Sequence, residues 1–230
     1  LALMHLERFE EVILFSEKLI EYYPEQLAGW KYKGVALSSL GRDEESIEYL
    51  NQAVKIDPTH SDSVATLATA LSFLDRDEES IACLDELLKL NPKDVDALDS
   101  KSLLLYELER YEESISCIDE LIKLHPEDSK RHIQKGSFLC KLSKYEESII
   151  CFEEAIRVNP KNSDGFTCKG NVLFDKLQRY EESLECYEEV IKIDPENPDT
   201  WYNLSASLAK LGRIEDSKQC FAKAKELEES

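Results

Sequence analysis

The sequence is poor in the residues that interrupt helices, since its 230 residues include only 7 glycines and 7 prolines. It also lacks any apolar run close to the roughly 18 residues that a membrane-spanning helix requires. Residues 1–5 have neither a basic start nor a long apolar stretch, so no signal peptide is visible. Few turn residues beside 42% hydrophobic and 33% charged residues favour a mostly helical, soluble protein without a membrane segment.

Basic residues are scarce as well. The chain has 28 Lys and Arg against 48 Asp and Glu, a formal net charge of −20. Nucleic-acid binding requires a basic patch that neutralises phosphates, and an anionic membrane surface attracts basic segments. We therefore predict no nucleic-acid and no membrane partner. An acidic chain permits a basic protein partner, although such a charge more often serves solubility alone.

A strict internal repeat is the main feature that is present. Prolines recur at positions 24, 58, 92, 126, 160 and 195, at spacings of 34, 34, 34, 34 and 35 residues. Such a period indicates one supersecondary unit copied in tandem. Between prolines lie two apolar stripes at helical spacing, one containing Trp30 and Leu37 and the other Leu50 and Ala53. Gly41 lies between the stripes, so each copy is predicted to be a helical hairpin.

These positions resemble the tetratricopeptide repeat over essentially the whole chain. With each proline numbered 32, position 4 holds Trp30 and Trp201, position 8 is always small, and position 20 is always serine. The resemblance implies an all-α, right-handed superhelical solenoid of antiparallel helix hairpins with a 34-residue period. It divides a single array into a partial repeat, 1–26, and the repeats 27–60, 61–94, 95–128, 129–162, 163–197 and 198–230.

Three local expectations follow from the aligned copies. The serines at position 20 are expected to bond the carbonyl one turn back in their own helix. One extra residue between Gly170 and Tyr180 is expected to produce a π-bulge or a longer turn. No capping helix follows the last repeat, so the face carrying Phe221 and Ala224 is expected to be partly exposed or covered by a neighbouring molecule. Because the sequence starts mid-repeat and without Met, we expect it to belong to a longer protein.

No residue cluster indicates catalysis, a cofactor or a metal. Five of the seven cysteines recur at position 23, too far apart for disulfides, and are predicted to be small buried hydrophobes in a reducing cytoplasm. Cys168, on a first helix, is the alternative candidate for a reactive thiol. The histidines lack metal-ligand spacing. Glutamate pairs such as Glu112 and Glu113 lie near the N-terminus of a predicted second helix, where the helix dipole stabilises negative charge. We predict a cytoplasmic protein that is not an enzyme.

The resemblance implies that the first helices line a concave groove, into which repeat positions 2, 5, 6, 9, 12 and 13 point. Exposed aromatic residues there would anchor a peptide, although folding back onto a neighbouring repeat is an equal alternative for Tyr106 and Tyr202. The candidate peptide-binding residues are Lys31, Tyr32, Thr66, Thr69, Phe73, Asp99, Leu103, Tyr106, Ile133, Gln134, Asn171, Tyr202 and Asn203.

Three functional hypotheses result. The first is a non-catalytic scaffold or adaptor that binds a peptide or protein segment in the groove. The second is a self-assembling array, a homo-oligomer formed through the terminal helices near Phe221 and Ala224. The third is the regulatory or targeting arm of a longer enzyme.

Overall fold

The computed structural model describes residues 8–229, which form thirteen helices and no strand. The all-α prediction is confirmed. We call the odd-numbered helices first helices and the even-numbered ones second helices, after their order in each repeat. The helices are α2 (Phe9–Tyr22), α3 (Leu27–Ser39), α4 (Asp43–Ile56), α5 (Ser61–Phe73), α6 (Asp77–Leu90), α7 (Val95–Glu107), α8 (Tyr111–Leu124), α9 (Ser129–Lys141), α10 (Tyr145–Val158), α11 (Ser163–Asp175), α12 (Tyr180–Ile193), α13 (Pro198–Lys210) and α14 (Ile214–Glu228).

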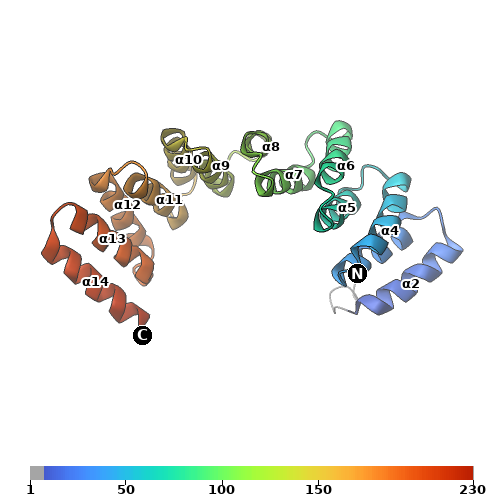
Figure 1. Ribbon diagram of the computed structural model, residues 1–230, viewed down its shortest axis with the longest axis horizontal. Helices are drawn as coiled ribbons and strands as arrows, with labels where there is room; N and C mark the ends of the chain where they lie inside the picture. The colour runs from blue at the N-terminus through green and yellow to red at the C-terminus, as the bar shows by residue number, and fades with distance from the viewer. Residues whose placement is uncertain (1–7, 230) are drawn as a thin grey trace. The chain divides into compact units, whose positions relative to one another are not determined.

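The chain forms two compact units, the first ending at Glu120 and the second beginning at Leu121, within α8. In the first unit, α2 to α7 each pack against the next helix along the chain, and α5 also contacts α3 and α7. In the second unit, α9 to α14 pack in the same consecutive way, and α9 contacts α11. Hairpins thus stack in chain order within each unit (Figure 1), which is the arrangement of a solenoid. Along residues 8–229, every helix is too short or too polar to cross a bilayer.

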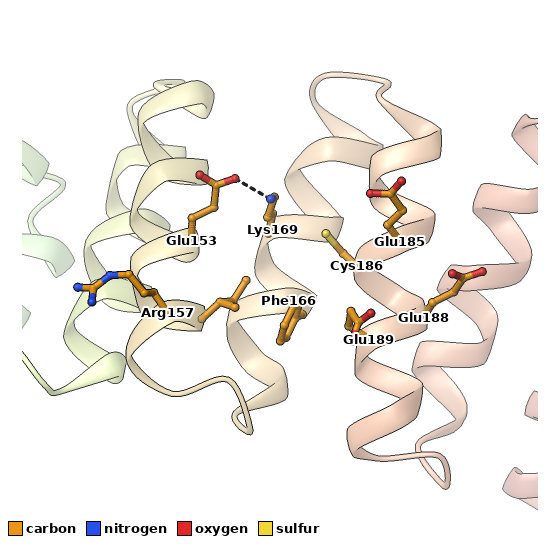
Figure 2. Close-up of a pocket in the computed structure, with 9 residues that line it drawn as sticks. Glu153, Arg157, Phe166, Lys169, Glu185, Cys186, Glu188 and Glu189 are labelled. Carbon is orange, nitrogen blue, oxygen red and sulfur yellow. Dashed lines mark hydrogen bonds and ion pairs between the residues drawn. The ribbon is translucent and has the colours of Figure 1, made fainter.

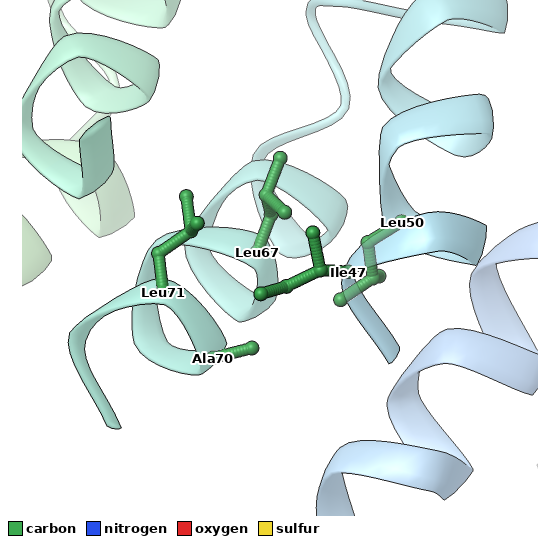
Figure 3. Packing of buried hydrophobic residues seen from close by; sticks show 5 residues of the cluster. All are labelled: Ile47, Leu50, Leu67, Ala70 and Leu71. Carbon is green, nitrogen blue, oxygen red and sulfur yellow. The ribbon is translucent and has the colours of Figure 1, made fainter. Parts of the chain in front are cut away.

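The apolar core lies between successive hairpins. In one cluster, Ile47 and Leu50 of α4 pack against Leu67, Ala70 and Leu71 of α5 (Figure 3). All five are buried, because each helix presents its apolar stripe to the helix on either side. This cluster therefore joins neighbouring repeats.

Side chains at the last position of a repeat start the next first helix. Asp94 accepts a hydrogen bond from the backbone N–H of Ala97 at 3.0 Å, and Asn162 accepts one from Asp164 at 2.9 Å. His60, Asp128 and Asn197 cap α5, α9 and α13 in the same manner. These acceptors satisfy backbone donors that a helix start leaves free. The first helices consequently begin at Ser61, Val95, Ser129, Ser163 and Pro198.

A residue in the left-handed region closes each turn within a hairpin. The positive φ angles fall at Gly41, Asp75, Glu109, Ser143, Gln178 and Gly212. In every one of these turns except that at Gln178, the following N–H bonds a carbonyl five residues back, as Arg42 does to Leu37 at 3.0 Å. This pattern is a Schellman motif, which satisfies carbonyls at the end of the first helix.

The fifth full repeat has a longer turn. Four residues, 176–179, separate α11 from α12, whereas three separate the other pairs. The N–H of Arg179 bonds the carbonyl of Leu173, six residues back, at 2.9 Å. Since α11 keeps the length of the other first helices, the extra residue widens only the turn. Of the two predicted outcomes, the longer turn is confirmed.

A small residue at position 8 lets the two helices of a hairpin approach closely. A Cβ on Gly136 would lie 2.5 Å from Cε1 of Phe152, and one on Gly170 would lie 2.8 Å from Cε1 of Tyr187. Both rings are almost fully buried and have no room to retreat. Leucine at position 24 occurs with either small residue: Leu50 faces Gly34, whose added Cβ would lie 2.6 Å from Cγ of Leu50, and Leu84 faces Ala68.

Five of the six serines at position 20 fall into two groups. Ser46, Ser80 and Ser114 donate across the hairpin to the carbonyls of Gly34, Ala68 and Ser102, at 2.9, 2.7 and 2.6 Å. The expectation of a bond within the same helix is therefore wrong for these three. It is right for Ser148 and Ser183, which donate to Tyr145 and Tyr180 at 2.7 and 2.9 Å. Position 24 is aliphatic in the first group and aromatic in the second, but Ser217, whose repeat has Phe221 there, shares a hydrogen bond with the hydroxyl of Ser205 across the hairpin at 3.0 Å.

Ion pairs join consecutive repeats at fixed positions. A lysine at position 7 meets an acid at position 25 of the preceding repeat, as Lys33 does with Glu17 at 2.8 Å and Lys169 with Glu153 at 2.7 Å. Lys101 pairs with Asp85 in the same way. The lysine side chains are mostly covered while their partners are about half exposed, so each pair helps to fix the stacking of a first helix on the second helix before it.

The last helix departs from one expectation. Phe221 is 46% exposed, as expected, but Ala224 is fully buried, so the expectation of partial exposure is wrong for Ala224. Ala224 occupies position 27, whose residues are buried in every full copy, for example Ala53 and Val190. This position therefore faces the interior of its own hairpin and needs no following repeat to cover it.

The close contact between the residues at positions 8 and 24 predicts that a smaller residue at position 24 restores stability lost by a larger residue at position 8. We expect Gly136→Ala to destabilise the protein by about 1–3 kcal/mol, because overpacking against the buried Phe152 exceeds the roughly 0.5–1 kcal/mol gained from alanine in a helix. The double variant Gly136→Ala/Phe152→Leu recreates the Ala68–Leu84 pairing and should be more stable than the single variant. Urea unfolding followed by circular dichroism measures both, and an undiminished loss in the double variant would contradict the matching.

Candidate functional site

The first unit contains a hollow of about 420 Å³ on α5, α6 and α7. It brings together three predicted groove residues, Thr69 and Phe73 of α5 and Leu103 of α7. The complete lining is Ala68, Thr69, Ser72, Phe73, Ser80, Leu84, Ser100, Leu103, Leu104 and Glu107. Ser72 and Glu107 occupy groove positions 12 and 13, so the positional rule that selected Phe73 also identifies these two residues.

Two large apolar side chains of this hollow are open to solvent. Phe73 is 71% exposed and Leu103 is 54% exposed. The polar residues beside them use their hydroxyl hydrogens inside the protein: Thr69 donates to the carbonyl of Ala65 at 2.9 Å, and Ser72 donates to Asp77 at 2.9 Å. Glu107 adds an exposed carboxylate. The hollow therefore offers apolar contact area with a polar edge.

The other candidates on α3 and α5 hold the fold together. Lys31 pairs with Asp62 of the next first helix at 2.7 Å, and Tyr32 packs against the cluster that contains Val12 and Leu37. Thr66 donates to the carbonyl of Asp62 at 2.7 Å. Asp99 lies half-buried on α7. These side chains line the first-helix side, but the structure places none of them in the hollow of Phe73 and Leu103.

Tyr106 closes its own hairpin. Its ring packs edge-on against Tyr111 of α8, with centroids 5.4 Å apart. The same two repeat positions hold a second aromatic pair, Phe174 and Tyr180, at 5.3 Å, and a hydrogen-bonded pair in which Ser72 donates to Asp77. Positions 12 and 17 are therefore a matched contact across the turn, and the ring of Tyr106 packs within its own repeat, not on a neighbouring repeat as the alternative expected.

Most candidates in the second unit are also engaged internally. Ile133 packs against the cluster containing Phe152, and Asn171 accepts a hydrogen bond from the hydroxyl of Tyr187 at 2.9 Å. Tyr202 packs edge-on against Phe221 at 5.3 Å and donates to Glu228 at 2.7 Å. Gln134 accepts from Arg131 at 3.3 Å, and Asn203 lies half-buried on α13. The structure thus places these five residues on first helices without gathering them around one hollow.

The cysteines are free thiols with little access to solvent. All seven are unpaired, and Cys117 and Cys186 are buried. Burial is the main cause that raises the pKa of Cys168 from 9.0 to about 11, and the nearby Asp164 carboxylate adds to the shift. Burial likewise raises the pKa of Cys186 to about 11. A high pKa keeps the thiol protonated, which disfavours the reactive alternative for Cys168. In the described part of the chain, no three His, Cys, Asp or Glu residues are placed to hold a metal ion.

Comparison with family models gives one consistent result. Models described as "Tetratricopeptide repeat" match residues 37–104, 95–128, 130–162 and 198–230, and a model described as "TPR repeat" matches 170–212. No curated protein matches the chain in sequence.

Three solved structures illustrate the similarity in fold. MamA residues 41 to the end from Desulfovibrio magneticus RS-1 shares 20% identity, covers 75% of this chain and 96% of its own, and has a TM-score of 0.62. The PilF protein of Pseudomonas aeruginosa shares 19% sequence identity, with the match covering 86% of this chain and 88% of PilF, and its TM-score is also 0.62. YrrB, described as a TPR protein with an unusual peptide-binding site, shares 19% sequence identity. The match covers 78% of this chain and 92% of YrrB, with a TM-score of 0.60. At these identities the likeness shows the fold.

The raised thiol pKa values predict slow alkylation in the native state. At pH 8.5, a shift from 9.0 to about 11 lowers the thiolate fraction of Cys168 about a hundredfold. Iodoacetamide labelling of each cysteine, quantified by mass spectrometry in native buffer and in urea, should show this protection at Cys168 and Cys186. The urea-unfolded chain is the control, and equal rates for Cys168 in both states would instead identify an accessible thiol.

Proposed function

Because the chain belongs to the tetratricopeptide repeat family, we propose that it is a non-catalytic scaffold whose first helices bind a segment of a partner protein. The observation that carries the proposal is the pair of exposed apolar side chains, Phe73 and Leu103, lining one hollow on adjacent first helices. The surfaces on which repeat proteins bind partners are built from such side-by-side helices. The peptide-binding site described for YrrB, a relative in fold, supports the same reading.

The hollow favours a partner segment that contributes an apolar side chain. Burying an exposed Phe or Leu side chain contributes about 1.5–3 kcal/mol, enough for each to act as an anchor. Thr69, Ser100 and Glu107 surround the anchors with groups that accept hydrogen bonds from a peptide backbone. Affinity would therefore come from Phe73 and Leu103, and the polar edge would fix the position of the bound segment.

A matched pair of double variants tests this site. Peptides selected from a random phage-displayed library on the intact chain are titrated by calorimetry against Phe73→Ser/Leu103→Ser. We expect at least roughly tenfold weaker binding, the equivalent of about 1.4 kcal/mol. The control Phe15→Ser/Leu14→Ser removes the same residue types from α2, where they are 60% and 61% exposed. It should leave binding within about twofold of the unmodified protein.

Circular dichroism spectra of both variants confirm that the helices persist. Selected peptides that bind the Phe73→Ser/Leu103→Ser variant as well as the unmodified chain would overturn the groove proposal. Equal weakening by both double variants would do the same, because it would show a general preference for apolar surface.

Self-association is a second candidate, supported by α14. Ile214 is 53% exposed and Phe221 is 46% exposed on this helix. If these side chains pair between copies, sedimentation should show a concentration-dependent dimer that Ile214→Lys abolishes. A chain that stays monomeric at high concentration would eliminate this candidate.

A further inference from the structure

A second hollow, of about 450 Å³, lies in the second unit and is separate from the first-helix groove. Helices α10 and α12, two successive second helices, contribute most of its lining, and α11 contributes Phe166 and Lys169 (Figure 2). The lining residues are Glu153, Ile156, Arg157, Phe166, Lys169, Glu185, Cys186, Glu188 and Glu189. The site therefore opens on the second-helix side of the repeats.

The lining combines an apolar interior with a charged edge. Phe166, Ile156 and Cys186 are buried or half-buried and supply the apolar part. The edge carries four glutamates against two basic residues. Phe166 provides an aromatic ring, whose negative face attracts cations. The hollow thus offers an apolar surface and an excess of negative charge.

The two basic residues are already paired. Lys169 binds Glu153 at 2.7 Å (Figure 2), and Arg157 binds Glu154, outside the hollow, at 2.7 Å. Glu189 pairs with Lys192 at 2.6 Å. Among the described residues, no hydrogen bond or ion pair involves Glu185 or Glu188. These two carboxylates lie three residues apart on α12 and share one face of the helix.

Glu188 lacks a partner for a definite reason. It occupies position 25, where Glu17, Asp85 and Glu153 each meet a lysine at position 7 of the following repeat. In the repeat that follows Glu188, position 7 is occupied by the buried Leu204, which cannot form an ion pair. The other described joint with a leucine there, Leu67, has the neutral Asn51 at position 25. The carboxylate of Glu188 is therefore not required for stacking.

The equivalent hollow in the first unit shows what the fold alone demands. It measures about 250 Å³, and Val54, Val64, Ala82 and Cys83 stand at the positions of Ile156, Phe166, Glu185 and Cys186. Apolar residues at three of these positions recur, as packing requires. This smaller hollow has neither an aromatic ring nor a carboxylate at the positions of Phe166 and Glu185, although Trp30 and Glu48 hold the same two positions in the repeat 27–60.

We infer that this hollow binds an arginine side chain carried by a basic segment of a partner protein. The aliphatic stem would lie against Phe166 and Cys186, the guanidinium would be held by Glu185, and Glu188 would add negative charge at the edge of the hollow. Arginine suits such a place because its planar fork bonds carboxylates bidentately and stacks on aromatic rings. The net charge of −20 would also steer a basic segment towards the chain.

A peptide with a neutral twin tests the inference. The probe is a fluorescein-labelled peptide Gly-Arg-Gly-Arg-Gly, and its twin replaces arginine with the uncharged isostere citrulline. Binding to the intact chain is measured by fluorescence anisotropy at about physiological ionic strength, where general charge attraction is screened. We expect the arginine peptide to bind and the citrulline peptide to bind at least roughly tenfold more weakly.

Charge-matched variants locate the binding. Glu185→Gln/Glu188→Gln should weaken the arginine peptide at least roughly fivefold. The control Glu147→Gln/Glu181→Gln removes the same charge from exposed positions on the same two helices, α10 and α12, and should change affinity less than about twofold. The groove variant Phe73→Ser/Leu103→Ser should bind the probe unchanged, which separates this site from the one proposed above.

Three outcomes would overturn the inference. The first is no binding of the arginine peptide at about millimolar protein. The second is equal binding of the citrulline twin. The third is equal weakening by both pairs of glutamine substitutions, which would reduce the effect to the overall acidity of the chain.

Discussion

Close packing at the crossing of each hairpin is the contact on which the rest of the chain depends. A hairpin presents two usable faces to its neighbours only if its helices lie close together, and position 8 controls that approach. Where Phe152 or Tyr187 fills the crossing, the opposite residue is glycine, and where Leu84 fills it, the opposite residue is alanine; Leu50 faces glycine and Phe221 faces serine, so position 8 is small in every copy. The stacking of repeats and their buried core depend on this close approach.

Each joint between repeats then has two sides with different chemistry. On the first-helix side, Phe73 and Leu103 remain exposed although their neighbours pair off within the protein. On the second-helix side, most position-25 acids are neutralised by lysine, and Glu188 is not. In both places the candidate binding groups are those that the repeat's own pairing rules leave unused. A solenoid thus separates the residues that stack from those available to a partner.

The hairpins and their first-helix starts could be predicted from the sequence because many aligned columns agree. A fixed proline, a small residue and a large apolar residue each constrain the same helix boundaries. The direction of individual side chains could not be predicted as well. The hydroxyl of Ser46 donates to the carbonyl of Gly34 on the facing helix, whereas that of Ser148 donates within its own helix, and the same residue type at the same repeat position gave no sign of the difference. The rings of Tyr106 and Tyr202 pack against Tyr111 and Phe221, which come close to them only in the folded chain. The hollow at Phe166 could not be predicted from the sequence. Its free carboxylate, Glu188, was not evident because the lysine that pairs with this position in other repeats is replaced by the buried Leu204.

The wider turn at 176–179 also bears on how such arrays are engineered. An added residue there left the helices on both sides at the common lengths and kept the 12–17 contact between Phe174 and Tyr180. The added residue in this turn therefore did not change the lengths of the two helices that stack on neighbouring repeats. The turn between α11 and α12 is accordingly a natural insertion point for a foreign loop or a reporter peptide, which would be displayed without altering the register of the repeats.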